Sequence, residues 1–186
     1  MAPTNSILIQ AMTEALSVDG AFIELGVFKG GRFALIVAFA KEHGRLVRGF
    51  DSFAGMQEPA EQDAGHYPKG SMNAYGTAAC VERLRSEGIE EGDYKLICGY
   101  IPDTFKKADF DSVAFAHIDL DQYIPTKAAL DWAWERMPAG GIILCHDYFR
   151  GRRCLASLAI DEFIIKNKGA CVINDIDYTA KIRKLK

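Results

Sequence analysis

Ionisable side chains stand directly after two strongly apolar segments of the sequence. The segment "VAFAHI" is followed by Asp119 and Asp121, and the segment "IILC" is followed by His146 and Asp147. Carboxylate and imidazole groups are costly to bury without partners. The pair His146–Asp147 therefore either caps a structural turn or holds a ligand.

A glycine-rich turn and a later aspartate suggest a nucleoside site. The stretch "ELGVFKGGR" has glycines at 26, 30 and 31, a G-x-x-x-G-G spacing that matches neither nucleotide-phosphate fingerprint. Asp51 ends the next apolar stretch, and a carboxylate there can accept both hydroxyl hydrogens of a ribose. NAD and S-adenosylmethionine share this ribose, but only S-adenosylmethionine lacks a phosphate. The alternative is an ordinary strand–helix turn with a solvated Asp51.

The elements that carry these residues alternate between strand and helix. Strands are expected over residues 20–27, 45–51, 94–99, 112–121, 140–147, 170–175 and 178–184, and helices over 5–17, 31–44, 77–88, 125–137 and 154–169. The inner strands are apolar without alternation, which indicates a parallel sheet covered on both faces. We therefore predict an α/β, doubly wound, mostly parallel seven-stranded sheet that closes with a C-terminal antiparallel hairpin.

Five successive strands are expected to deliver small, polar or acidic residues to one edge of this sheet. Ligands of open α/β sheets bind at the carboxyl ends of the strands. The residues at those ends are Glu24 and Gly26, Asp51 and Ser52, Cys98 and Gly99, Asp119 and Asp121, and His146 and Asp147. One such ending would be weak evidence, whereas five together predict a binding site.

The motifs "FIELGVFKGG", "GFDSFAGM", "GYIPDTF", "HIDLDQY" and "GGIILCHDY" resemble the macrocin O-methyltransferase family, over roughly residues 20–165. A weaker similarity extends to the catechol O-methyltransferases. The resemblance implies a Rossmann-like class I methyltransferase that uses S-adenosylmethionine and a divalent metal. It further implies methylation of a hydroxyl on a sugar or natural-product acceptor.

The resemblance also assigns cofactor residues. Glu24, Gly26 and Gly30 fall in the cofactor motif, and Asp51 with Ser52 would meet the ribose. The remaining expected cofactor contacts are Gly99, Asp119, and Lys29 at the cofactor carboxylate, for which Arg32 is the competing candidate.

The expected metal ligands are Asp119, His146 and Asp147, and the expected catalytic residues are Asp119, as general base, and His146. The family has paired aspartates where this chain has His146 and Asp147, and the motif leaves the role of Asp121 undefined. Three outcomes are open at His146. The site holds a softer divalent ion than magnesium, or magnesium with water in place of the lost carboxylate, or no metal, with His146 as the base.

Composition sets the remaining expectations. A length of 186 residues predicts one domain over residues 1–186, and a net charge of −3 argues against nucleic acid as a partner. No apolar run reaches the roughly 18–20 residues of a membrane span, and the N-terminus lacks signal-peptide features. The five scattered cysteines, Cys154 among them, predict free thiols in a reducing cytoplasm.

Two segments should govern the acceptor, a small hydroxylated molecule. Residues 1–18 are expected to hold a short N-terminal cap helix, and residues 54–76 a mobile substrate loop, in which His66 is expected to be solvated. The chain lacks most of the N-terminal segment expected of the family, which invites a second copy to complete the pocket as a homo-oligomer. The alternatives are a nicotinamide-dependent oxidoreductase and a non-catalytic S-adenosylmethionine-binding relative.

Overall fold

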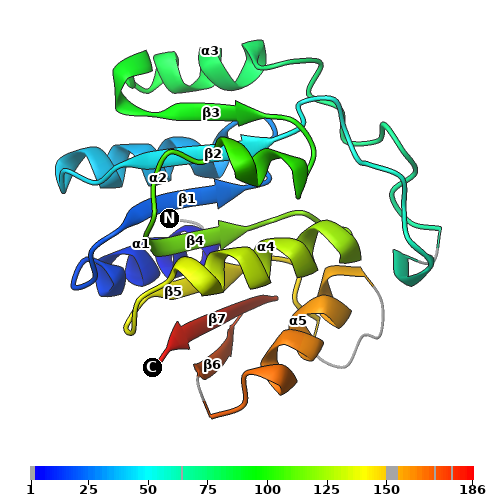
Figure 1. The fold of residues 1–186 in the computed structure, drawn as a ribbon. Coiled ribbons are helices and arrows are strands. Elements are labelled where there is room, and N and C mark those ends of the chain that lie inside the picture. Colours follow the sequence, from blue (N-terminus) through cyan, green and yellow to red (C-terminus); the bar gives the residue numbers. More distant parts are fainter. Residues whose placement is uncertain (1–2, 64, 150–154, 170, 177) are drawn as a thin grey trace.

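The computed structural model describes residues 3–63, 65–149, 155–169, 171–176 and 178–186 (Figure 1). Its helices are α1 Pro3–Ala15, α2 Gly31–Glu42, α3 Ala78–Ser86, α4 Tyr123–Arg136 and α5 Leu155–Lys166. Its strands are β1 Ala21–Leu25, β2 Val47–Asp51, β3 Lys95–Cys98, β4 Val113–Ile118, β5 Ile142–Cys145, β6 Cys171–Ile176 and β7 Thr179–Lys184.

The strands form one seven-stranded sheet in the order β3-β2-β1-β4-β5-β7-β6. The pairs among β1 to β5 are parallel, and β7 runs antiparallel to both β5 and β6. In Figure 1 the arrows of β1 to β4 point the same way and that of β7 points back. The predicted sheet and its C-terminal antiparallel pair are therefore confirmed.

The order of the strands reverses between β1 and β4, which are neighbours in the sheet although β2 and β3 lie between them in sequence. Such a reversal opens a crevice at the carboxyl ends of the two strands, where open α/β sheets bind ligands. The crevice lies above Leu25 and Ile118, which are Cα partners at the ends of the two strands.

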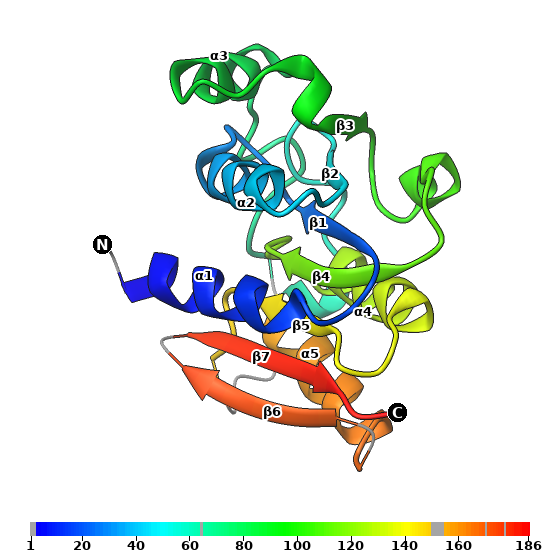
Figure 2. The same ribbon diagram turned by 90° about the vertical axis from the view of Figure 1, so that its left-hand side faces the viewer.

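Helices cover both faces of the sheet, and each face has its own apolar core (Figure 2). Helices α1, α2 and α3 contribute to the core on one face, where the rings of Phe22 and Phe115 lie 5.4 Å apart. Helices α4 and α5 contribute to the other, where Phe50 meets Trp132 at 5.6 Å. Each fully buried side chain of this size contributes about 1.5–3 kcal/mol.

The N-terminal helix α1 is part of this core. Its side chains Leu8 and Met12 are buried against the sheet. At its C-terminal end Glu14 accepts hydrogen bonds from Arg183 and from Lys181, the latter at 3.0 Å, so that α1 is tied to β7. Asn5 lines the pocket described below. The helix predicted as a cap thus packs on the sheet and also reaches the site.

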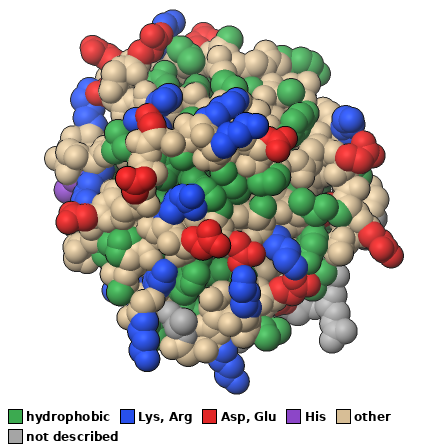
Figure 3. All heavy atoms as spheres, in the orientation of Figure 1, with side chains coloured by type: hydrophobic (Ala, Val, Ile, Leu, Met, Phe, Trp, Pro, Cys, Tyr) green, Lys and Arg blue, Asp and Glu red, His purple; other side chains and the backbone are tan. Residues whose placement is uncertain are grey.

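Acidic and basic side chains are interspersed over the face shown in Figure 3, in line with the small net charge. Among the described residues, the helices are all too short or too polar to cross a membrane. Cys80, Cys98, Cys145 and Cys171 are free thiols, and Cys154 lies outside the described residues.

Candidate active site

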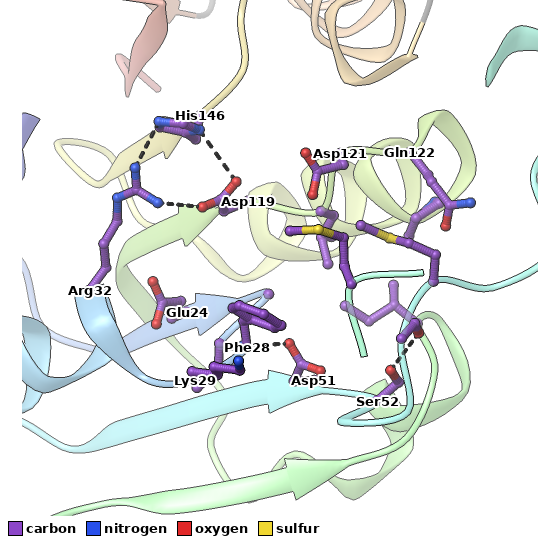
Figure 4. A pocket seen from close by; sticks show the side chains of 18 of the residues that line it. Glu24, Phe28, Lys29, Arg32, Asp51, Ser52, Asp119, Asp121, Gln122 and His146 are labelled. Atoms are coloured by element: carbon purple, nitrogen blue, oxygen red, sulfur yellow. Dashed lines mark hydrogen bonds and ion pairs between the residues drawn. The ribbon is translucent and has the colours of Figure 1, made fainter. Parts of the chain in front are cut away.

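A pocket of about 580 Å³ opens at the carboxyl ends of the parallel strands (Figure 4). This volume is within the range of small-molecule sites. All the residues predicted at the strand ends except Cys98 line it, namely Glu24, Gly26, Asp51, Ser52, Gly99, Asp119, Asp121, His146 and Asp147, and so does Lys29. Gly30 is not part of the lining. The predicted edge of the sheet is therefore a real concavity.

The backbone turns sharply where four strands enter the pocket. Phe28, Phe53, Asp121 and Asp147 follow β1, β2, β4 and β5, and each has a positive φ, between 51° and 58°. Non-glycine residues adopt this left-handed conformation rarely, at a cost of about 1–3 kcal/mol each. The sequence predicted glycines in such turns and did not reveal that side-chain-bearing residues make them.

Asp119, His146 and Asp147 meet at one wall of the pocket. Nδ1 of His146 lies 2.8 Å from Oδ1 of Asp147 and 3.4 Å from Oδ1 of Asp119. One ligand atom from each residue falls within 4.8 Å of the others. Nδ1 is buried, yet neither carboxylate is aligned with it for a hydrogen bond. Two oxygens and a nitrogen without a well-aligned partner fit a divalent cation.

Arg32, from the first turn of α2, also reaches this cluster (Figure 4). Its Nη1 donates to Oδ2 of Asp119 at 2.6 Å, and its Nη2 lies 2.8 Å from Nε2 of His146. The sequence offered Arg32 only as a competitor of Lys29 for the cofactor carboxylate. The signal available was its place in the first turn of a helix that follows a glycine turn, and that signal does not indicate a contact with β4 and β5.

The charges of the cluster perturb its ionisation. The adjacent carboxylates of Asp119 and Asp147 raise the pKa of His146 to about 9. A guanidinium only donates hydrogen bonds, so the contact of Arg32 with Nε2 requires a lone pair on that nitrogen and forms only with the neutral imidazole. The hydrogen bond between Arg32 and His146 therefore belongs to the neutral state of the His146 ring. Burial, followed by the nearby Asp147 and Asp119, raises the pKa of Asp121.

Glu24 and His117 form a fully buried pair beneath the pocket. Oε1 of Glu24 lies 2.8 Å from Nδ1 of His117. The other oxygen, Oε2, is buried without a hydrogen-bond partner. Burial, partly offset by His117, raises the pKa of Glu24. His117 is thus a hydrogen-bonded core histidine, and Glu24 keeps one free acceptor at the pocket wall.

Asp51 and Ser52 line the pocket but also hold its backbone. Oδ2 of Asp51 accepts a hydrogen bond from the backbone N–H of Phe28 at 2.8 Å, and Oδ1 accepts one from Phe53 at 2.6 Å. Burial raises the pKa of Asp51, although these backbone donors oppose the shift. The hydroxyl of Ser52 donates to the carbonyl of Gly55 at 2.8 Å. Asp51 thus fixes the turns after β1 and β2.

The predicted glycines and Lys29 have distinct surroundings. A Cβ on Gly30 would lie 2.9 Å from the Cys80 sulfur, so this glycine lets α2 and α3 pack together. A Cβ on Gly99 would lie 2.9 Å from Cγ2 of Thr104. Nζ of Lys29 lies 5.2 Å from the ring centre of Phe28.

Hydrogen bonds connect the loop over residues 54–76 to α4. Oδ1 of buried Asp63 accepts from the backbone N–H of Tyr123 at 2.8 Å. Nε2 of Gln122 donates to the carbonyl of Gln57 at 3.1 Å. Met56 and Met72 of the loop line the pocket, whereas His66 is exposed and does not. The mobility of the loop stays a prediction, but its described part carries defined attachments.

Comparisons with known proteins agree with this geometry. Residues 6–184 match the family model described as macrocin-O-methyltransferase (TylF). The chain is 24% identical over 159 residues to demethyldecarbamoylnovobiocin O-methyltransferase from Streptomyces niveus. This alignment covers 81% of this chain and 60% of the relative. A second relative is 8-demethyl-8-(2,3-dimethoxy-alpha-L-rhamnosyl)-tetracenomycin-C 4'-O-methyltransferase from Streptomyces olivaceus, to which the chain is 26% identical over 140 residues. This second alignment covers 70% of this chain and 54% of the relative.

The chain thus spans less than two thirds of the length of these curated relatives. Among solved structures, the O-methyltransferase NovP superposes with a TM-score of 0.87 at 22% identity. That superposition covers 98% of this chain and 80% of NovP, and it confirms the Rossmann-like methyltransferase fold.

Proposed function

Because the chain belongs to the macrocin O-methyltransferase family, we propose that it transfers a methyl group from S-adenosylmethionine to a hydroxyl of a small molecule. The proposed acceptor is a sugar or natural-product hydroxyl, since matched relatives are named for reactions of that kind. The observation that carries the proposal is the Asp119–His146–Asp147 cluster at the wall of a pocket above the β1–β4 crevice.

The reaction is an in-line displacement. The acceptor oxygen attacks the methyl carbon, the carbon–sulfur bond breaks, S-adenosylhomocysteine leaves, and the hydroxyl proton passes to a base. Asp119 is the proposed base, with His146 as the second catalytic residue. Holding the two reactants in line contributes about 7–11 kcal/mol, whereas a general base contributes about 10²–10⁴-fold. Positioning in the pocket is therefore the larger effect.

Asp119, His146 and Asp147 would hold a divalent metal. When bound, such an ion orients the acceptor oxygens and lowers their pKa. Two carboxylate oxygens and one imidazole nitrogen suit manganese or a softer ion better than magnesium, which prefers oxygen ligands. Magnesium with an additional water, and a metal-free site with His146 as base, are the two alternatives that measurement must separate.

The proposed cofactor site lies on the β1–β2 side of the pocket. Asp51 and Ser52 would face the ribose, while Glu24, Gly26 and Gly99 line the pocket beside them. Gly30 would act indirectly, by letting α2 pack closely against α3. The carboxylate of the cofactor would meet Lys29, whose ammonium group is exposed at the pocket lining. Oε2 of Glu24 is buried without a hydrogen-bond partner, which supports the placement of a donor group of the cofactor beside it.

Calorimetry with S-adenosylhomocysteine tests the proposal directly, with NADH as the comparison ligand. Binding of S-adenosylhomocysteine alone is expected, and a folded sample that binds neither would contradict the function. Turnover is then measured on a panel of polyhydroxylated acceptors with S-adenosylmethionine. Cofactor binding without turnover on any of them would favour the non-catalytic relative. The family match already disfavours a nicotinamide-dependent oxidoreductase.

Two further parts of the proposal concern the setting of the enzyme. We place it in the cytoplasm, which the free thiols at Cys80, Cys98, Cys145 and Cys171 support. We also expect a second copy to contribute to the pocket, and light scattering of the purified chain tests this expectation.

A further inference from the structure

The guanidinium of Arg32 bridges two of the three residues that would bind a metal. Nη1 donates to Oδ2 of Asp119 at 2.6 Å, and Nη2 lies 2.8 Å from Nε2 of His146. Both contacts are partly buried, with the Arg32 side chain 33% exposed and that of Asp119 19% exposed. Figure 4 shows the arginine rising from α2 to face both residues from the side opposite Asp121.

This contact determines where the imidazole carries its proton. An arginine side chain has donors and no acceptor, so Nε2 of His146 must accept the hydrogen bond. A neutral imidazole has one N–H, which is therefore on Nδ1. Nδ1 is the nitrogen that lies 2.8 Å from Asp147 and 3.4 Å from Asp119. Arg32 thus favours the tautomer whose N–H faces the two carboxylates.

A metal requires the opposite tautomer. The nitrogen that faces Asp119 and Asp147 can bind a cation only through a lone pair, and the proton must then be on Nε2. An N–H at Nε2 would point at the N–H of Arg32 across 2.8 Å, so the contact must break. Arg32 and the metal therefore need not occupy the same position to exclude each other.

We propose that Arg32 is a positioning residue that holds the site in its metal-free form, so that a divalent cation binds only when Arg32 releases His146. The inference rests on the metal site of the proposed function and does not depend on the identity of the acceptor. It assigns to a residue of α2 the control of a metal site formed by β4 and β5. Metal affinity in this chain is then set by Arg32 as well as by the three ligands.

The test compares the metal affinity of Arg32→Met with that of the unchanged chain. Methionine keeps most of the length of the side chain and removes the charge and the donors. Lys29→Met is the matched control, because Lys29 also lines the pocket with a positive charge but has its Nζ over the Phe28 ring. Each protein is titrated with MnCl₂ by calorimetry, in the absence of cofactor.

We expect Arg32→Met to bind Mn²⁺ at least tenfold more tightly than the unchanged chain, and Lys29→Met to differ by less than threefold. A gain below threefold in Arg32→Met, an equal gain in Lys29→Met, or no Mn²⁺ binding by any of the three proteins overturns the inference.

A second measurement does not depend on the variants. Nitrogen-15 NMR of the metal-free, histidine-labelled chain, assigned with His146→Gln, should show the Nδ1–H tautomer at His146. An Nε2–H tautomer or a doubly protonated ring overturns the inference. Calorimetry with S-adenosylhomocysteine is carried out on the unchanged chain: if the cofactor binds and Arg32→Met gains no Mn²⁺ affinity, only this inference fails, whereas absent cofactor binding by the unchanged chain contradicts the proposed function itself.

Discussion

A Cβ atom on Gly26 would lie 1.8 Å from the carbonyl oxygen of Asp119. The end of β1 therefore packs against the end of β4 with no room for a side chain. Two backbone hydrogen bonds hold this arrangement, from Gly26 N–H to the carbonyl of Phe50 at 2.8 Å and from Asp119 N–H to the carbonyl of Leu25 at 2.9 Å. Gly26 thus positions Asp119 and also lines the pocket.

Gly26→Ala should destabilise the fold. The new Cβ would clash with the Asp119 backbone, and the φ of +96° is unfavourable for alanine. Overpacking and backbone strain together predict a loss of about 2–5 kcal/mol in the free energy of unfolding, measured by urea denaturation. Gly31→Ala is the control, because a Cβ there meets nothing within 4 Å. Equal stability of the two variants would contradict this account of Gly26.

Asp63→Ala should loosen the loop over residues 54–76. Asp63 is buried, with one oxygen accepting from the N–H of Tyr123 and the other from the N–H of Ala60, each at 2.8 Å. Loss of both acceptors leaves buried donors unpaired, at a cost of about 1–3 kcal/mol. Limited proteolysis should then cut the loop faster than in the unchanged chain. Exposed Glu61, in the same turn, is replaced by alanine as the control, and equal cleavage rates in the two variants would refute the attachment.

The sequence predicted those parts of the site that follow from strand order. Asp119, His146 and Asp147 each follow an apolar strand, so parallel pairing alone brings them to one edge. Arg32 could not be placed in this way, because its contact with His146 depends on the rotation and tilt of α2 against the sheet. The left-handed turns at Phe28 and Asp121 were also hidden, since tertiary packing imposes them on residues that do not favour them.

Glu14→Gln should weaken the attachment of α1 to β7 at neutral pH, where Glu14 is ionised. Burial alone would raise the pKa of Glu14, but hydrogen bonds and charge from Lys181 and Arg183 hold it below its usual range. A carboxylate with a lowered folded-state pKa adds stability above its unfolded pKa of about 4.3, and this contribution is lost as the pH falls through the lower folded value. At pH 7 we expect a loss of about 1–2 kcal/mol in the free energy of unfolding.

The measurement of Glu14→Gln is urea denaturation at several pH values. The difference between the variant and the unchanged chain should shrink as the pH falls below about 4, because a protonated Glu14 and the glutamine of the variant make similar interactions. A difference that stays constant down to about pH 3 would show that the carboxylate charge is not the source of the stability.

Asp147→Asn should lower metal content and methyl transfer together. Asp147 has a φ of +58°, which asparagine tolerates, so the turn after β5 is kept while the charged ligand is lost. We expect at least a tenfold loss in Mn²⁺ affinity by calorimetry and a parallel fall in turnover. Exposed Asp131 pairs with Lys166 on the surface, and Asp131→Asn removes the same charge away from the pocket as a control.

The pattern of the Asp147→Asn results separates the three alternatives at His146. Lower turnover with unchanged bound metal would show that Asp147 is not a ligand. If the purified chain carries no metal and chelators leave its turnover intact, His146 acts as the base without a metal. If chelation abolishes turnover, restoration by Mn²⁺ or Zn²⁺ in preference to Mg²⁺ would indicate the softer ion, because an imidazole nitrogen in place of a carboxylate disfavours magnesium.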